Sequence, residues 1–278
     1  MIKFFEKDPY APIQYVYDID KVLYKGRSKF QEIMVVENPY FGRILVLDGV
    51  VQITEKDEFF YHEMLVHVLM HAHPDPQNII VIGGGDGGTV REVLKHDTVK
   101  KVFFIEIDED VINVSKKFFP SVSCSIDDSR VEIMCMDGAE FVKNRDKDID
   151  IIIVDSTDIV GFAKSLFTVE FFKSVRDSLT DEGMFVTLSE SLHFHKDLVI
   201  EVQEAMRLIF PVVDLYTAPL ATYAGNWWTF SVASRKHDPR VMRREFKIDT
   251  KYYSDEIHSQ AFLPRKFYDK LMAKGLKW

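Results

Sequence analysis

The sequence predicts an α/β fold with a mostly parallel sheet, an antiparallel edge hairpin and a small N-terminal β domain. Strand-like apolar segments alternate with amphipathic helical segments from about residue 79, which is typical of a parallel sheet covered by helices. The first of these strands leads through a glycine-rich loop into a helix. Paired strand signals precede it. We therefore expect an N-terminal β domain over 1–57 and a larger α/β domain with a C-terminal tail over 58–278.

The N-terminal region is predicted to be β structure. Residues 30–36 and 43–47 have strand composition and are separated by turn residues at 38–42. Asp48-Gly49 is a strong hairpin signal before a further strand at 50–53. Because a sheet of this size buries little core by itself, we expect it to pack on the main domain or on a second subunit.

A helix is predicted over 58–70, where apolar residues recur at helical spacing. It carries a sequence similar to the zinc motif H-E-x-x-H. However, His62 and His67 are five residues apart and point in different directions, whereas the motif needs two histidines on one face. We interpret His67, His71 and His73 as structural or solvated side chains and expect no metal site.

The glycine-rich loop follows the buried strand at 79–82. Gly83, Gly85 and Gly88 satisfy G-x-G-x-x-G, which indicates a Rossmann-like nucleotide-binding unit. Asp86 lies inside this loop, where a pyrophosphate would need bare amide groups and a helix N-terminus. An acid at this position favours a nucleoside-type ligand that carries positive charge. The alternative is a tight turn in which Asp86 caps the helix.

The rest of the chain continues the alternation. Strands are predicted at 102–105, 131–136, 151–154 and 184–188, and helices at about 169–179 and 195–210. The strands at 212–216 and 227–232 form the edge hairpin, since Gly225-Asn226 lies in the turn between them. A charged and aromatic tail begins at about residue 236.

Acidic residues stand at the carboxyl ends of the predicted parallel strands. Ligands of open α/β sheets bind there, so these acids should converge on one crevice; they are Asp86, Glu106, Asp137, Asp155 and Asp158. Glu106 lies about 20 residues past the loop, the spacing of an acid that binds ribose hydroxyls. Asp137 is placed to accept a hydrogen bond from an adenine amino group. Crowded carboxylates repel one another, so a ligand with several positive charges, such as a polyamine or a sulfonium ion, fits them.

Composition limits the remaining function classes. The 278 residues have a net charge of −9 and ordinary globular composition, with 46% hydrophobic and 28% charged residues. This charge disfavours nucleic acid as a partner, and no apolar segment approaches the roughly 18 residues of a membrane span. The start, at residues 1–6, is too short and too charged for a signal peptide, and two cysteines make a disulfide framework unexpected. We therefore expect a cytoplasmic protein.

Several ordered motifs closely resemble the spermidine synthases, the aminopropyltransferases. They are the segments 47–52 (LDGVVQ), 57–64 (DEFFYHEM), the glycine loop, 155–158 (DSTD) and 251–264 (KYYSDEIHSQAFLP). The resemblance runs nearly end to end. It implies a Rossmann-like fold of the class I methyltransferase type and a homodimer or homotetramer.

The resemblance also implies a reaction and its residues. The family moves an aminopropyl group from decarboxylated S-adenosylmethionine to an amine such as putrescine, giving spermidine and methylthioadenosine. Asp155 would be the general base and Tyr61 would orient the attacking amine. Donor contacts would come from Gln31, Gln52, Asp86, Glu106 and Asp137, and acceptor contacts from His62, Asp158 and Tyr223. Because the sulfonium is already an activated leaving group, neither a metal nor a further cofactor is needed.

Departures from the family pattern lie near the acceptor end. The gate loop at 158–162 lacks the usual prolines, Ala224 replaces a usual proline, and Leu188 replaces a usual glutamine. Two lost prolines should loosen the gate loop. Besides putrescine, the acceptor alternatives are therefore cadaverine, agmatine, 1,3-diaminopropane and spermidine.

Other classes of function make different demands on Asp86 and Asp155. A nicotinamide-dependent oxidoreductase needs a neutral loop, and a methyltransferase that uses intact S-adenosylmethionine has no use for Asp86, because the donor's own carboxylate would be repelled there. A non-catalytic polyamine-binding protein would keep the acids but would need no base at Asp155.

Overall fold

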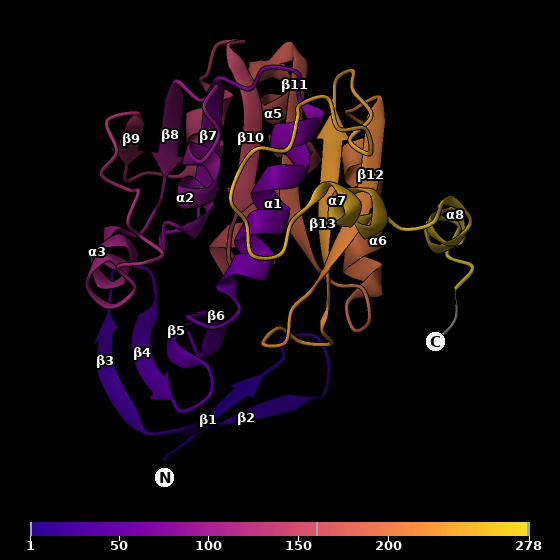
Figure 1. Cartoon of the computed structure of the whole chain (residues 1–278). Helices are drawn as coiled ribbons and strands as arrows, with labels where there is room; N and C mark the ends of the chain where they lie inside the picture. The colour runs from indigo at the N-terminus through magenta and orange to yellow at the C-terminus, as the bar shows by residue number, and fades with distance from the viewer. Residues whose placement is uncertain (1, 160, 277–278) are drawn as a thin grey trace.

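A seven-stranded sheet with helices on its faces stands above a smaller set of N-terminal strands (Figure 1). The structure is a computed structural model that describes residues 2–159 and 161–276. The gate-loop segment singled out above therefore contains one residue, Val160, that lies outside the described residues. Within the described ranges, no helix is both long and apolar enough to cross a lipid bilayer.

The N-terminal strands form two antiparallel sheets, β1-β2 and β3-β4-β5-β6. Their bounds are β1 Ile2–Lys7, β2 Gln14–Ile19, β3 Lys21–Arg27, β4 Glu32–Asn38, β5 Gly42–Leu47 and β6 Val50–Thr54. Asp48 and Gly49 have φ angles of 46° and 85°, and they form the predicted hairpin turn between β5 and β6. Buried residues of β4 and β5, such as Ile33 and Leu45, share a core with Val111. This confirms that the small sheet packs on the main domain.

The main sheet has the strand order β12-β13-β11-β10-β7-β8-β9. The strands from β11 to β9 are parallel, and β13 pairs antiparallel with both β11 and β12, as predicted for the edge hairpin. The bounds are β7 Asn78–Gly83, β8 Lys101–Ile105, β9 Val131–Met134, β10 Ile149–Asp155, β11 Leu179–Ser191, β12 Val212–Pro219 and β13 Trp227–Ser234. The α/β fold with a mostly parallel sheet is thereby confirmed.

Helices cover both faces of this sheet and extend into the C-terminal tail. Their bounds are α1 Glu58–Ala72, α2 Gly88–Leu94, α3 Glu109–Phe118, α4 Gly138–Lys143, the 3-10 helix η1 Gly161–Phe167, α5 Val169–Ser178, α6 Lys196–Arg207, α7 Asp255–Ala261 and α8 Arg265–Met272. The predicted helix at 58–70 is α1, and almost all of it is buried because the tail also covers it. The Glu63 carboxylate accepts the backbone N–H groups of Lys251, Tyr252 and Tyr253, which ties the tail to α1.

The strand order creates a crevice between β7 and β10. The chain runs from β7 to β8 and β9 on one side and then returns to place β10 on the other side of β7. Such a switch point leaves a crevice at the carboxyl ends of the two strands. Gly83 at the end of β7 pairs with Asp155 at the end of β10, so both the glycine loop and Asp155 border this crevice.

Candidate active site

A cavity of about 370 Å³ occupies the crevice and the space between it and the N-terminal strands. All five acids predicted to converge line it, as do the other residues that the resemblance assigns to the site. The lining residues among them are Gln31, Gln52, Tyr61, His62, Asp86, Glu106, Asp137, Asp155, Asp158 and Tyr223. The topology of a parallel sheet therefore brings together residues that are far apart in the sequence.

Asp155 lies at the centre of the cavity and is held on both carboxylate oxygens. The Tyr61 hydroxyl donates to Oδ1 at 2.9 Å, and the Thr89 hydroxyl donates to Oδ2 at 2.6 Å. Burial and the nearby charge of Asp86 raise the pKa of Asp155 to about 6. A carboxylate in this environment is a stronger base than an exposed aspartate and has a fixed orientation.

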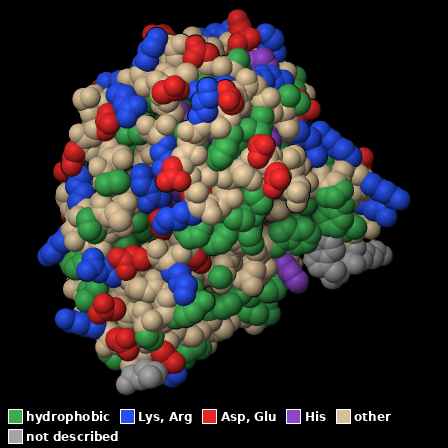
Figure 2. Space-filling view, in the orientation of Figure 1, with side chains coloured by type: hydrophobic (Ala, Val, Ile, Leu, Met, Phe, Trp, Pro, Cys, Tyr) green, Lys and Arg blue, Asp and Glu red, His purple; other side chains and the backbone are tan. Residues whose placement is uncertain are grey.

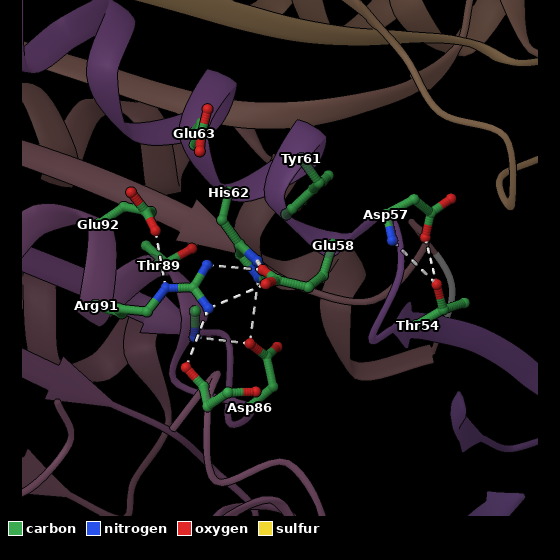
Figure 3. A network of polar contacts seen from close by, with 12 residues as sticks. Thr54, Asp57, Glu58, Tyr61, His62, Glu63, Asp86, Thr89, Arg91 and Glu92 are labelled. Carbon is green, nitrogen blue, oxygen red and sulfur yellow. Dashed lines mark hydrogen bonds and ion pairs between the residues drawn. The ribbon is translucent and has the colours of Figure 1, made fainter. Parts of the chain in front are cut away.

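A buried chain of charges connects the glycine loop to α1 and α2 (Figure 3). The Arg91 guanidinium donates to both oxygens of Glu58, and the Glu58 carboxylate contacts His62 Nδ1 at 2.6 Å. His62 Nε2 in turn lies 3.2 Å from Asp86 Oδ1. Although burial opposes a charged ring, Asp86 and Glu58 raise the pKa of His62 well above its usual value. His62 is therefore an imidazolium that neutralises part of the negative charge around Asp86.

Asp86 also stabilises the loop before α2, whose N-cap residue is Gly87. Its Oδ1 accepts the Gly88 backbone N–H at 2.7 Å, which stabilises the turn into α2. Despite burial, the adjacent His62 lowers the pKa of Asp86, so it stays ionised. A carboxylate that lines the cavity in this state attracts a cationic group of a ligand.

The glycines of the loop leave room for functional side chains. A Cβ atom on Gly84 would lie 2.5 Å from Asp155 Oδ2, and one on Gly85 would lie 3.0 Å from Glu106 Oε2. A Cβ on Gly88 would lie 2.3 Å from the His62 ring. The loop is thus rich in glycine because three cavity side chains approach its backbone closely.

We expect the substitution Gly88→Ala to displace the His62 ring and to separate it from Asp86. Because His62 holds the pKa of the buried Asp86 low, its displacement should let Asp86 take up a proton, and affinity for a cationic ligand should then fall by about tenfold or more. Calorimetric titration with decarboxylated S-adenosylmethionine measures this. Gly275→Ala is the matched control, because a Cβ at Gly275 would make only an ordinary contact, 3.5 Å from the Lys270 carbonyl oxygen. Unchanged affinity in Gly88→Ala would contradict the expectation.

Three of the residues that the resemblance assigns to the donor, Glu106, Gln31 and Asp137, lie near the carboxyl ends of β8 and β9. Glu106 follows β8, and its Oε1 accepts the Asp108 backbone N–H at 2.9 Å. Gln31 from the N-terminal sheet reaches the same place, because its side-chain amide donates to Asp108 Oδ2 at 2.8 Å. Asp137 caps α4 through Oδ1, which accepts the backbone N–H groups of Ala139 and Glu140. Burial raises the pKa of Glu106 to about 7.

The acceptor-side residues lie toward the N-terminal strands and β11. Burial and the charge of Glu190 raise the pKa of Asp158 well above its usual value. The Tyr223 hydroxyl donates to the backbone carbonyl of Gln52, which connects the β12–β13 turn to the N-terminal sheet. Leu188 and Ala224, the two residues that depart from the family pattern, also line the cavity.

Sequence reasoning missed four further cavity residues at this end, namely Glu6, Asp8, Glu190 and His195. Glu190 belongs to β11, so the rule that acids gather at strand ends could have found it. Glu6 lies in β1, Asp8 follows that strand, and His195 precedes α6, where no local pattern marks them. Only the packing of the N-terminal strands against β11 and α6 brings them to the cavity.

The histidines of α1 other than His62 are structural, as predicted. His67 Nε2 contacts Glu92 Oε2 at 2.9 Å, and its Nδ1 contacts His96 Nε2 at 3.0 Å. His71 contacts the backbone carbonyl of His67. Burial lowers the pKa of His71 to about 4, so this ring is neutral. These side chains fill the space between α1, α2 and the tail rather than the cavity.

Two family models match separate parts of the chain. Residues 58–244 match the family model described as "Spermine/spermidine synthase domain". Residues 2–55 match the one described as "Spermidine synthase tetramerisation domain". The chain belongs to the spermidine synthase family. It is accordingly a transferase of the aminopropyltransferase class.

Relatives in this spermidine synthase family cover the whole chain. A polyamine aminopropyltransferase of Hydrogenobaculum sp. (strain Y04AAS1) is 56% identical over 277 residues, covering 100% of this chain and 99% of the relative. Polyamine aminopropyltransferase 1 of Aquifex aeolicus (strain VF5) is 51% identical over the same length and with the same coverage. The match to the tetramerisation domain indicates that the chain forms oligomers.

Solved spermidine synthases have the same fold. One, described as a complex with the transition state analogue AdoDATO, superimposes with a TM-score of 0.91 at 36% identity, covering 98% of this chain and 95% of the other. Spermidine synthase from Thermotoga maritima gives a TM-score of 0.88 at 36% identity, covering 98% and 94%. The Rossmann-like fold with its small N-terminal β domain is therefore that of the spermidine synthases.

Proposed function

We propose that this enzyme transfers the aminopropyl group of decarboxylated S-adenosylmethionine to putrescine, giving spermidine and methylthioadenosine. The observation that carries this proposal is the buried Tyr61–Asp155 pair, which lies between the donor-side and acceptor-side acids of one cavity. The solved spermidine synthase in complex with AdoDATO supports the choice of donor class.

The donor is assigned to the side of the cavity near Glu106. The Glu106 carboxylate would accept hydrogen bonds from both ribose hydroxyls. Asp137 would accept a hydrogen bond from the adenine amino group. Gln31 and Gln52 would complete the donor contacts, and Asp86 would face the donor's primary amine. Because intact S-adenosylmethionine has a carboxylate beside that amine, Asp86 would repel it and select the decarboxylated form.

The transfer is a displacement with a proton removed by Asp155. Bound putrescine arrives as an ammonium ion, with a pKa near 10 and no free electron pair. Asp155 accepts one N–H proton, and the nitrogen then forms a bond to the aminopropyl carbon next to sulfur. The C–S bond breaks, and its electron pair converts the sulfonium to a neutral thioether. A pKa of about 6 makes Asp155 a better base for this step than an exposed aspartate.

The acceptor is assigned to the other side of the cavity. Tyr61 would orient the attacking nitrogen, and the Asp158 carboxyl would bind the far ammonium group. Tyr223 would complete the acceptor contacts, whereas His62, which the resemblance also assigns to the acceptor, is positively charged and would act through Asp86 instead. Positioning the two substrates in line supplies much of the acceleration, since the leaving group is already activated.

Activity should decline in acid because two carboxyl groups must be ionised. The pKa of Glu106 is raised to about 7 and that of Asp155 to about 6, so both gain protons as the pH falls. A plot of log kcat/KM for the donor against pH should bend near 7 and again near 6, with a limiting slope of about 2 below both values. A profile that is flat between pH 5 and 8 would contradict both assignments.

Product analysis tests the proposed function directly. Purified protein is incubated with decarboxylated S-adenosylmethionine and one amine at a time, and products are identified by mass spectrometry. The panel contains putrescine, cadaverine, 1,3-diaminopropane, agmatine and spermidine. Methylthioadenosine should appear fastest with putrescine. Faster transfer to another amine would identify that amine as the acceptor in place of putrescine. Donor binding without any transfer would favour a polyamine-binding protein.

We infer that the chain assembles as a homodimer or homotetramer through its N-terminal strands. Apolar side chains reach the surface there, including Phe5 at 55% exposure, Val16 at 52% and Tyr40 at 65%. Figure 2 shows apolar side chains in the lower part of the view, where these strands lie in Figure 1. Light scattering after size exclusion should give two or four times the 32.3 kDa of one chain. The monomer mass would contradict the inference.

A further inference from the structure

His195 lies at the far end of the acceptor side, between two carboxylates from distant parts of the chain. Its Nε2 lies 3.0 Å from both oxygens of Asp8, and its Nδ1 lies 3.6 Å from Glu190 Oε2. The side chains of all three are buried, with exposures of 2% for His195 and 1% for the two acids. His195 Nδ1 and Glu190 Oε2 have no hydrogen-bond partner among the described residues.

The carboxylates that face the two ring nitrogens favour a proton on each nitrogen of His195. Asp8 Oδ1 already accepts the backbone N–H groups of Tyr10 and Ala11, and an N–H at His195 Nε2 faces both Asp8 oxygens. A neutral ring would then turn the Nδ1 electron pair toward the Glu190 carboxylate. The Nδ1 electron pair and the carboxylate would repel each other, whereas a proton on Nδ1 makes the contact attractive. Asp8 and Glu190 raise the pKa of His195 against the opposing effect of burial, in agreement with the geometry.

The imidazolium pairs with two of the four acids at this end of the cavity. The four are Glu6, Asp8, Asp158 and Glu190. Burial raises the pKa of Glu6 to about 7, and its oxygens already accept hydrogen bonds from Val51 and Tyr17. Lys7 also lines the cavity but is exposed. Of these four acids, Asp158 is the one that the resemblance assigns to the acceptor, so it is the acid proposed to bind the far ammonium group.

His195 also lies between the cavity and the outer surface, since it belongs to the lining of both. It lines the cavity on one side and, on the other, a surface hollow formed by Tyr10 and residues 193–198. The Tyr10 ring packs against it edge-on, with 5.3 Å between ring centroids. The Tyr10 hydroxyl donates to the Ile159 carbonyl, and the Ile159 N–H donates to Glu190. His195 is thus held in place by Tyr10, Asp8 and Glu190 while it fills the end of the acceptor side.

We propose that His195 determines acceptor length, because its buried positive charge and its ring exclude a third amine nitrogen from the end of the cavity. This inference rests on the proposed function. A diamine ends at Asp158, whereas a triamine would bring its last ammonium group toward the imidazolium. Like charges in contact oppose binding strongly. Removal of His195 leaves Asp8 and Glu190 free to bind that ammonium and opens a path toward the surface hollow.

Three variants separate charge from bulk. His195→Gln removes the charge and keeps most of the volume, His195→Ala removes both, and His195→Lys keeps a positive charge. The measured quantity is the ratio of kcat/KM for spermidine to kcat/KM for putrescine. We expect this ratio to rise by about tenfold or more in the glutamine and alanine variants and to stay near the wild-type value in the lysine variant. The gain should lie in the KM for spermidine, whereas the KM for the donor should not change.

His193→Gln is the matched control, since His193 is exposed and lines only the surface hollow. Donor affinity and melting temperature establish that each variant is folded. If the wild type transfers to putrescine and the ratio is the same in all variants, the inference on His195 is wrong and the proposed function stands. If this ratio rises in the lysine variant as much as in the glutamine variant, the positive charge of His195 does not determine acceptor length. If the wild type transfers to no amine, both fail.

Discussion

Replacement of Asp155 by asparagine should lower kcat for aminopropyl transfer by about 10³-fold, within the range of general base catalysis. Asparagine has the same shape and its carbonyl oxygen can still accept the Tyr61 hydroxyl, but it cannot accept a proton from the amine. Donor affinity should change by less than about tenfold, because Glu106, Asp137 and Asp86 remain. Rapid-quench formation of methylthioadenosine and calorimetric donor titration measure the two effects separately.

Stability provides a further check on the Asp155→Asn variant. Asp86 and Asp155 repel each other in the buried cavity, as the raised pKa of Asp155 shows. The asparagine variant should therefore melt no lower than the wild type. Asp146→Asn, in an exposed position before β10, is the control for the substitution itself. A variant at Asp155 that is folded, binds donor and keeps wild-type turnover would exclude Asp155 as the base.

Replacement of Glu106 by glutamine should raise the KM for the donor by about 10²-fold and leave kcat nearly unchanged, because charge-assisted hydrogen bonds to the ribose would be lost. Glutamine can still accept the Asp108 N–H, so the end of β8 should keep its structure. Steady-state kinetics with the donor varied and the acceptor saturating give both constants.

Two measurements sharpen the test of Glu106. Glu109→Gln is the control, because Glu109 is exposed in the first turn of α3 and lies three residues away. In Glu106→Gln, the bend near pH 7 in the donor profile should disappear, and the bend near pH 6 should remain. A large loss of kcat at an unchanged donor KM would mean that Glu106 acts in the chemical step instead.

The sequence predicted the main sheet well because its strands are short, β-branched and buried on both faces. It located β7, β8, β10 and the β12–β13 hairpin, and it placed acids at the strand ends. Individual strands β1 to β3 were not located, since their exposed positions weaken the apolar pattern. The helices α3, α4, α7 and α8 were missed too, and the last three have only six to eight residues, which carry little periodic signal.

Some residues of the site could likewise be predicted from the sequence, and others could not. The acids from Asp86 to Asp158 could be predicted because strand direction alone sends them to one edge of a parallel sheet. Local sequence could not indicate that Gln31 contacts Asp108, since the N-terminal sheet must first pack on α3. Nor could it indicate why the loop has so many glycines. The reasons are the positive φ angles of Gly83, Gly84 and Gly87 and the close approach of Asp155, Glu106 and His62 to the loop backbone.

By itself, the sequence determined the fold class, the family and the acids that face the crevice, because strand-end position and motif spacing are properties of the chain. Only the tertiary structure decided the ionisation of those acids and the shape of the acceptor end. Burial and neighbouring charges set the pKa values of Asp155 and Glu106. The contact of Asp8 with His195 joins residues 187 positions apart, and it exists only when the segment after β1 meets the segment before α6.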